Sequence, residues 1–262
     1  MKVVTNRYFD EQVVLVTVHQ VRGSAPREEG AWMLVSGQGI EGTVGGGHME
    51  LEAIAQARSM LGGGEREAQR EWKLGPSLGQ CCGGTMQLHF ERIADAASLP
   101  ARLAPRRAPL ALFGGGHVGR AIVDAFAPLP FDVTWIDSRD GIFPERVPAN
   151  VQCEHSEPVQ AAVPQLAAHS RVFVMSFSHA EDLDVVAACL KRLRERSDLP
   201  YVGLIGSATK WATFRHRLEQ RGFTDAELAR ITCPIGIPGI DGKQPEVIAA
   251  SAAAQVLQLA PP

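Results

Sequence analysis

The sequence lacks the features of membrane, secreted and nucleic-acid-binding proteins. No apolar run approaches the ~18 residues that a membrane span requires. The first residues, MKVVTNRYFDEQ, contain no apolar stretch followed by small residues, so no signal peptide is expected. The formal net charge is -3 and no long basic run occurs, which argues against a nucleic-acid surface. We therefore expect a cytoplasmic protein whose partners include neither a membrane nor a nucleic acid.

Cysteine is also scarce, with five in 262 residues. An odd number spread thinly over the chain excludes a disulfide framework, and free thiols suit a reducing cytoplasm. Cys153, Cys189 and Cys233 lie in apolar-rich segments and are expected to be small core residues. Cys81 and Cys82 differ, because their neighbours are Gln, Gly and Thr.

The first part of the chain predicts an N-terminal mixed α/β domain over residues 1–93. Apolar residues at helical spacing indicate a helix over 48–61, and three glycines at 62–64 end it. Short runs rich in β-branched or alternating apolar residues indicate strands. These strands are expected at 13–19, 31–35, 71–74 and 85–93.

The second part predicts a different architecture. Residues 94–108 are rich in Ala, Pro and Arg without a clear strand pattern, and we expect them to form an interdomain linker. From residue 109 to 262, strand-like runs alternate with helical ones, which is typical of a Rossmann-like, doubly wound parallel sheet. The tail is expected to form a helix with Pro245 in its first turn.

A glycine fingerprint marks the start of this second domain. Gly114, Gly116 and Gly119 form G-x-G-x-x-G between an expected strand and an expected helix. Such a turn lets a pyrophosphate approach the backbone, and the helix start offers N–H groups to it. Asp137 ends the next strand, where a ribose-binding acid is expected, and His117 would contact phosphate. The alternative is a Rossmann-like fold that binds nothing here, with His117 a surface residue.

A second glycine-rich turn lies in the N-terminal domain. Gly45, Gly46 and Gly47 precede His48 and the expected helix, so backbone amides again point out of a helix start. No Gly-Lys-Ser/Thr follows, so the turn is not a P-loop. We count these four residues as candidate ligand contacts.

The segment VRGSAPREEG adds hydrogen-bond donors after the first strand. Arg22, Ser24 and Arg27 would suit an anionic ligand. The alternative for these three residues is an ordinary solvated turn.

The adjacent cysteines call for a different chemistry. Metal sites usually space their cysteines by about two to four residues, and a disulfide between neighbours is strained. The glycines after Cys82 would let a ligand approach both sulfurs, and thiols near backbone amides are reactive. Sulfur transfer or soft ligation of a thiophilic metal by Cys81 and Cys82 would fit. The alternative is a turn in which one cysteine is buried and the other has no functional role.

Six segments together resemble the xanthine dehydrogenase accessory proteins of the XdhC type. They occur in the order of that family and extend over nearly the whole chain, which makes them far more specific than one glycine fingerprint. The segments are VRGSAPREEGAWMLV, GTVGGGHMELEA, LGQCCGGTMQL, LALFGGGHVGRAI, YVGLIGSATKWATFRHRL and CPIGIPGIDGKQPEVIAASAAAQVL.

The resemblance implies a chaperone for molybdenum cofactor, either molybdopterin or its dinucleotide form. Such a protein holds the cofactor while a cysteine desulfurase supplies sulfur, then inserts it into an apo-molybdoenzyme of the xanthine dehydrogenase type. Cys81 and Cys82 would then face the molybdenum or its incoming sulfur, and His179 would be a further cofactor contact. A homodimer is expected.

One departure from the family and two alternative functions accompany this expectation. Where the family commonly shows a second histidine in a TH-x-H pattern, this chain has Phe177, while His179 is kept. An NAD(P)-dependent oxidoreductase would explain the glycine fingerprint, and a thiol-based redox sensor that binds a nucleotide would explain the cysteines. The sequence shows no triad of nucleophile, base and orienting group, so the chain is not expected to be an enzyme by itself.

Overall fold

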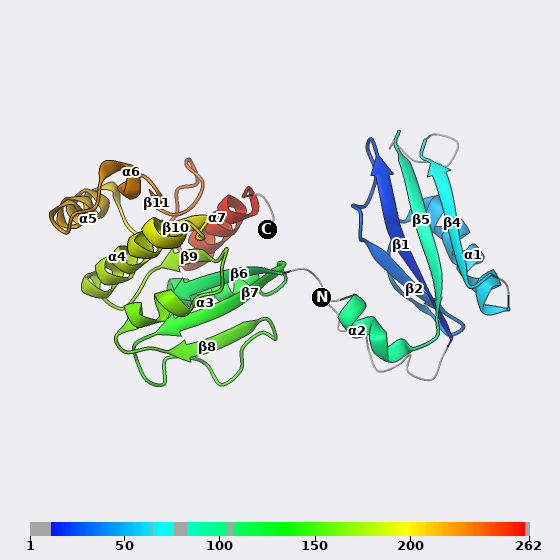
Figure 1. Ribbon diagram of the computed structural model, residues 1–262, viewed down its shortest axis with the longest axis horizontal. Coiled ribbons are helices and arrows are strands. Elements are labelled where there is room, and N and C mark those ends of the chain that lie inside the picture. Colours follow the sequence, from blue (N-terminus) through cyan, green and yellow to red (C-terminus); the bar gives the residue numbers. More distant parts are fainter. Residues whose placement is uncertain (1–11, 64, 76–82, 104–106, 260–262) are drawn as a thin grey trace. The chain divides into compact units, whose positions relative to one another are not determined.

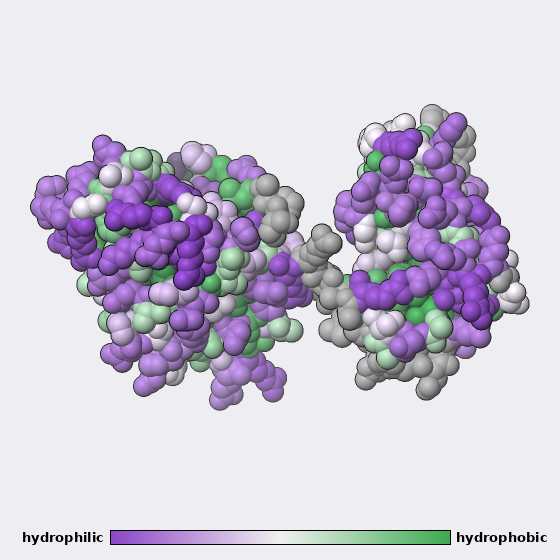
Figure 2. Space-filling model, in the orientation of Figure 1, coloured by the Kyte–Doolittle hydropathy of each residue, from purple (hydrophilic) through white to green (hydrophobic). Residues whose placement is uncertain are grey.

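The computed structural model describes residues 12–63, 65–75, 83–103 and 107–259. The chain divides into two compact units, Met1–Ala104 and Pro105–Pro262, so the boundary falls inside the segment expected as a linker. Figure 2 shows that hydrophilic residues predominate on the viewed face of each unit. Cys81 and Cys82 lie outside the described residues.

The N-terminal unit is built on a five-stranded antiparallel sheet with the order β3-β2-β1-β5-β4. Figure 1 labels β1, β2, β4 and β5 of this sheet. The expected strands and the helix α1 (Gly47–Leu61) are all present, and the short β3 was not predicted. The strands are β1 (Val13–Arg22), β2 (Trp32–Ser36), β3 (Ile40–Gly42), β4 (Glu67–Lys73) and β5 (Thr85–Ile93).

Both faces of this sheet are covered. Alternate residues of β1 point to opposite faces, so Val14 and Val16 pack in the core that contains α1, while Leu15 packs with Leu99 and Leu103. The second cover comes from two short helices, η3 (Ala96–Ser98) and α2 (Leu99–Arg102). Part of the expected linker is therefore folded, because its leucines at a spacing of four bury themselves against the sheet.

The C-terminal unit contains a six-stranded parallel sheet with the order β11-β10-β9-β6-β7-β8. In chain order this is the 3-2-1-4-5-6 arrangement of dinucleotide-binding folds, which confirms the doubly wound sheet. The strands are β6 (Ala108–Phe113), β7 (Phe131–Asp137), β8 (Val151–His155), β9 (Arg171–Val174), β10 (Tyr201–Leu204) and β11 (Ile231–Thr232).

Helices cover both faces of the parallel sheet. The helices α3 (His117–Phe126) and α7 (Pro245–Leu257) pack on one face. The other face carries η4 (Val159–Gln165), α4 (His179–Arg196), α5 (Ala208–Gln220) and α6 (Asp225–Leu228). The strands β9 and β10 are buried along their whole length, as a strand covered on two faces must be.

The three cysteines of this unit follow the sequence expectation to different degrees. Cys189 on α4 is fully buried, and this burial raises the pKa of its thiol to about 12. Cys153 and Cys233 are partly buried and pack against the cores. None of the described helices has the length and apolar character that crossing a bilayer demands.

Candidate functional site

The carboxyl edge of the parallel sheet gathers the residues of the glycine fingerprint. All six strands run in the same direction, so the segments that follow them lie at one edge. The strand β6 pairs with both β7 and β9, which makes this the point where the winding of the sheet reverses. Ligands of open α/β sheets bind at such a switch point. Residues 114–119 follow β6 here, Asp137 ends β7, and His179 begins α4 after β9.

The three glycines of this 114–119 loop are needed for different reasons. Gly114 has a φ of 124°, and an added Cβ would lie within 3.0 Å of the Met175 carbonyl oxygen. A Cβ on Gly119 would come equally close to the carbonyl oxygen of Gly114. A Cβ on Gly116 would meet no heavy atom within 4 Å. Gly114 and Gly119 therefore serve close packing, whereas Gly116 borders open space.

The start of α3 beside Gly116 has no side-chain cap. By contrast, hydroxyl groups accept backbone N–H bonds at the starts of α4, α5 and α6, from Ser178, Ser207 and Thr224 respectively. The first N–H groups of α3 and the positive end of its dipole thus suit an external anion.

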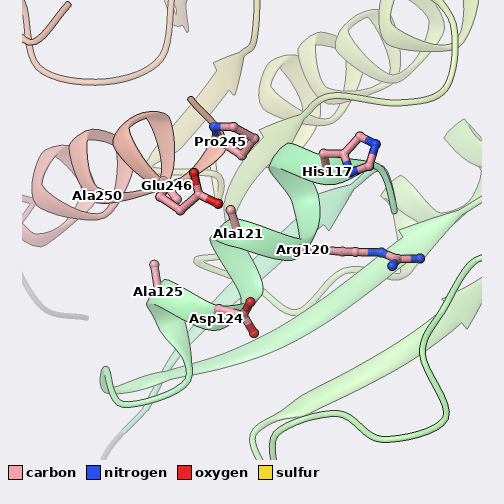
Figure 3. Close-up of a pocket in the computed structure, with 9 residues that line it drawn as sticks. His117, Arg120, Ala121, Asp124, Ala125, Pro245, Glu246 and Ala250 are labelled. Carbon is pink, nitrogen blue, oxygen red and sulfur yellow. The ribbon is translucent and has the colours of Figure 1, made fainter. Parts of the chain in front are cut away.

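His117 begins α3 and is exposed. It lines a cavity of about 420 Å³ between α3 and α7, together with Arg120, Asp124 and Glu246 (Figure 3). Arg120 also donates to the carbonyl oxygen of Ile142 at 3.1 Å. The structure thus places His117 at the start of α3, beside a cavity that the sequence did not indicate.

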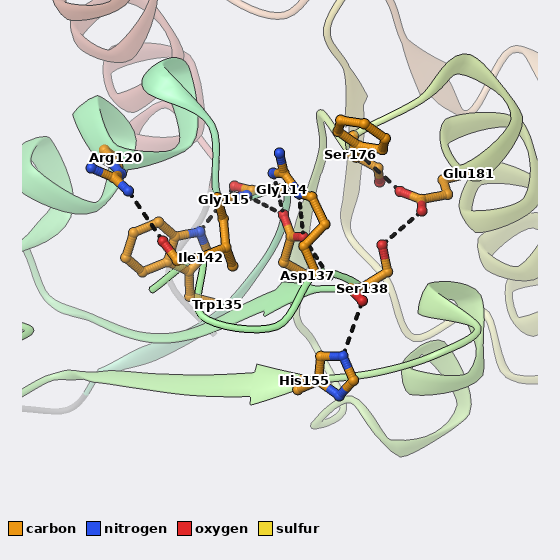
Figure 4. A network of polar contacts seen from close by, with 12 residues as sticks. Gly114, Gly115, Arg120, Trp135, Asp137, Ser138, Ile142, His155, Ser176 and Glu181 are labelled. Atoms are coloured by element: carbon orange, nitrogen blue, oxygen red, sulfur yellow. Dashed lines mark hydrogen bonds and ion pairs between the residues drawn. The ribbon is translucent and has the colours of Figure 1, made fainter. Parts of the chain in front are cut away.

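Asp137 is already fully engaged within the chain (Figure 4). Its side chain is 1% exposed, and its Oδ2 accepts from the N–H of Gly115 at 2.6 Å and from Nη2 of Arg139 at 2.9 Å. Its Oδ1 accepts from the backbone N–H and from Nε of Arg139, both at 2.9 Å. Burial alone would raise the pKa of Asp137, but the bonds from Arg139 and Gly115 outweigh burial and lower it.

Arg139 also contacts an exposed aromatic ring. Its guanidinium carbon lies 4.7 Å from the ring centroid of Phe177. The hydroxyl of Ser138 donates to Glu181 at 2.7 Å (Figure 4). The backbone N–H of Phe177 donates to the same side chain at 3.2 Å. The expected contact His179 instead faces the ring of Phe214, with centroids 6.2 Å apart.

A second group of ionisable residues at this edge was missed by the sequence analysis. Nζ of Lys210 donates to Oδ2 of Asp182 at 2.7 Å and to the carbonyl oxygen of Ile205 at 2.8 Å. Cys233, after β11, lines a cavity of about 740 Å³ that the 233–243 loop forms with α7. Burial raises the pKa of the Cys233 thiol, while the charge of Lys210 opposes this rise. The residues come from separate elements, so no sequence spacing joins them.

The N-terminal glycine turn (residues 45–47) already binds a carboxylate side chain of the protein itself. The backbone N–H groups of Val44, Gly45 and Gly46 donate to Oε2 of Glu50 at 2.9, 3.3 and 3.0 Å. The hydroxyl of Thr43 donates to the same oxygen. Two of the amides expected to face a ligand, those of Gly45 and Gly46, are thus already bound to a carboxylate of α1. The 45–47 loop is therefore less open than the sequence suggested.

The other N-terminal candidates lie around this loop. Nη1 of Arg27 donates to the Thr43 carbonyl oxygen at 3.3 Å, and His48 lies 3.2 Å from Glu52 on the exposed side of α1. Arg22 points toward Gln20, with Nη2 3.3 Å from Oε1.

The two ends of the segment that contains the adjacent cysteines also reach this region. The N–H of Gly84 donates to the carbonyl oxygen of Ser24 at 3.1 Å, and that of Leu74 donates to the carbonyl oxygen of Gly84 at 2.8 Å. The 22–27 loop, the 45–47 loop and the residues flanking 76–82 therefore converge at one end of the N-terminal sheet.

We expect Glu50→Gln to lower the free energy of unfolding by about 1 kcal/mol at pH 7, because it weakens the bonds that the carboxylate accepts from Thr43 and the loop amides. The loss is no larger because Glu50 is partly solvent-exposed. Burial would raise the pKa of Glu50, but the bonds from Thr43 and the loop amides lower it below its ordinary 4.5. A lowered pKa stabilises the fold above pH 4.5, and this contribution disappears as the pH falls further. Urea unfolding from pH 7 to pH 3 should therefore show the variant approaching the wild type. Glu71→Gln, at an exposed position on β4, is the control, and an equal loss there would contradict the role of Glu50.

In the part of the chain that the structure describes, no three His, Cys, Asp or Glu side chains are grouped to hold a metal ion. The expected metal ligands Cys81 and Cys82 lie outside that part.

Comparison with known proteins places the chain in a family. The family model described as the XdhC Rossmann domain matches residues 110–256, and that of the XdhC and CoxI family matches residues 10–71. The chain belongs to the XdhC family. The 114–119 loop and Asp137 lie in the first matched region, and Arg22 and residues 45–48 lie in the second. Cys81 and Cys82 lie in neither.

The chain is also similar to two other proteins. The uncharacterized protein YqeB of Escherichia coli K12 is 32% identical over 245 residues, which are 91% of this chain and 42% of YqeB. The chain thus spans less than half the length of that relative. A crystal structure described as a xanthine dehydrogenase from Bacillus halodurans is 19% identical, with a TM-score of 0.76 over 96% of this chain and 92% of the other. At this identity the likeness shows a shared fold.

Proposed function

We propose that this XdhC family member binds molybdenum cofactor, holds it for sulfuration and inserts it into apo xanthine dehydrogenase or a related molybdoenzyme. Membership of the family supports a general accessory role. The observation that carries the finer proposal is the uncapped start of α3 beside Gly116, which suits an anionic ligand.

The described residues fit the phosphate end of the cofactor at one of the two glycine loops. Molybdopterin ends in a phosphate and its dinucleotide form contains a pyrophosphate, and both need N–H donors with open access. The 114–119 loop offers these, because Gly116 borders open space. The 45–47 loop offers fewer, because Glu50 already accepts from the amides of Gly45 and Gly46. When bound, the cofactor would supply the molybdenum centre that receives sulfur.

Partners and location complete the proposal. Cys81 and Cys82 would act as soft ligands near the metal or its incoming sulfur. A cysteine desulfurase would deliver that sulfur, and an apo-molybdoenzyme would receive the cofactor. We infer that the protein acts in the cytoplasm as a homodimer and is not an enzyme by itself.

Gly116→Ala tests the loop directly. We expect it to weaken cofactor binding about tenfold or more with little change in stability, because the methyl group would stand where a phosphate must approach the backbone. Binding is measured by titration of the full chain with molybdenum cofactor, and delivery by activation of an apo-molybdoenzyme. Gly37→Ala is the matched control, because an added Cβ there also meets nothing within 4 Å. Equal cofactor affinity in both variants and the wild type would contradict this site.

A further inference from the structure

We propose that Arg139 is a specificity-determining residue that closes the ribose position of the 114–119 loop. By occupying the carboxylate of Asp137, it makes the loop take a ligand through its phosphate and reject nicotinamide dinucleotides. This deepens the proposed function, on which it rests for the identity of the loop as the ligand site.

The first step concerns the acceptor capacity of Asp137. An ionised carboxylate has about four lone-pair positions, and four donors reach Asp137 at 2.6 to 2.9 Å. In NAD-binding proteins of this fold, the acid at this position accepts from a ribose hydroxyl. Here a ribose must first displace a bond from Arg139 or Gly115. Since the side chain is 1% exposed, no free acceptor face remains.

The second step concerns how firmly Arg139 is held. Its Nε and Nη2 bind the two oxygens of Asp137 in the paired geometry that makes arginine–carboxylate bonds strong. The guanidinium also packs over the ring of Phe177, a residue that is 65% exposed. Displacement of Arg139 would break both contacts, whereas a phosphate at Gly116 breaks neither.

The third step concerns a 2′-phosphate, which an arginine near this position accommodates in NADP-binding proteins. The charge of Arg139 is already balanced by Asp137, whose hydrogen bonds are the main cause of the raised pKa of Arg139, and the charge of Glu181 adds a smaller contribution in the same direction. Ser138 and the Phe177 N–H hold Glu181 in place. Two carboxylates against one guanidinium oppose a further anion here. The geometry therefore disfavours NADP as well as NAD.

The decisive experiment is a gain of binding. Isothermal titration of the full chain with NAD⁺ and ADP-ribose should give no saturation for the wild type up to about 1 mM. Arg139→Ala should bind both ligands at least about tenfold more tightly, because two acceptor positions of Asp137 become free. Arg139→Gln keeps one donor and should lie between them.

Arg107→Ala is the matched control. Arg107 forms an ion pair with Asp132 at 3.3 Å where β7 begins, at the opposite edge of the sheet, and its loss should leave NAD⁺ binding unchanged. Circular dichroism verifies folding, and Arg139→Gln decides the matter if Arg139→Ala does not fold. Saturable NAD⁺ binding by the wild type, or no gain in a folded Arg139 variant, would overturn the proposal. NADP⁺ binding that is lost in Arg139→Ala would also overturn it. Titration with molybdenum cofactor is a separate measurement, so failure of the proposed function would be distinguished from failure of this inference.

Discussion

Asp182→Ala should lower the free energy of unfolding by about 3–5 kcal/mol. The Asp182 side chain is 3% exposed and accepts from the Ser176 N–H and from Nζ of Lys210, each at 2.7 Å. Without the carboxylate, the ammonium of Lys210, whose side chain is 13% exposed, keeps the Ile205 carbonyl and the ring of Phe214 as its partners among the described residues. A buried charge that loses its counterion is far more costly than a lost surface pair.

The same helix provides the control for this prediction. Asp184 on α4 forms an exposed ion pair with Arg221 at 2.8 Å, and Asp184→Ala should change stability by less than about 0.5 kcal/mol. The double variant Asp182→Ala/Lys210→Met should regain much of the loss, because it removes the uncompensated ammonium. Urea unfolding followed by tryptophan fluorescence measures all three. Equal losses at Asp182 and Asp184 would show that the buried pair contributes little.

The Asp182–Lys210 pair also matters for the site. It joins the segment after β9, the first turn of α4 and the first turn of α5 at the carboxyl edge of the sheet. The same segment contains Met175, whose carbonyl oxygen packs against Gly114. The pair therefore fixes one wall of the switch point at which the 114–119 loop lies.

The local patterns of the sequence predicted the architecture well. The place of G-x-G-x-x-G between a strand and a helix, the alternation of strands and helices, and Pro245 at the start of α7 each depend on neighbouring residues, and all three were confirmed. The run of β-branched residues at 13–19 likewise indicated a strand, and β1 confirms it. Such features are predictable because backbone geometry and side-chain spacing determine them without tertiary contacts.

The partners of polar groups could not be predicted in the same way. Asp137 was expected to accept a hydrogen bond from a ribose, yet Arg139, two residues later, already donates to both of its oxygens. The amides of the 45–47 loop were expected to bind an external anion, yet two of them, on Gly45 and Gly46, donate to Glu50. An acidic residue in the first turn of a helix was a usable signal for Glu50. No comparable signal existed for Cys233 and Lys210, which separate elements bring together.

Gly119→Ala should destabilise the protein by about 3 kcal/mol, although intrinsic helix propensity predicts the opposite sign. Gly119 lies inside α3, where alanine is favoured over glycine by about 1 kcal/mol at an open position. Here, however, the new Cβ would lie within 3.0 Å of the carbonyl oxygen of Gly114. That atom belongs to the backbone, so no side chain can rotate away, and α3 must shift from the turn after β6.

Gly116→Ala makes the comparison decisive, because it places the same methyl group three residues earlier in the same loop. It should keep the wild-type stability to within about 0.5 kcal/mol, since its Cβ meets open space. Thermal and urea unfolding of the two variants, together with titration by molybdenum cofactor, separate the two roles. We expect Gly119→Ala to lose stability and Gly116→Ala to lose ligand affinity. A stabilised Gly119→Ala would mean that the helix start can move away from β6. The 114–119 loop would then lack the rigid backbone packing that a preformed phosphate site requires.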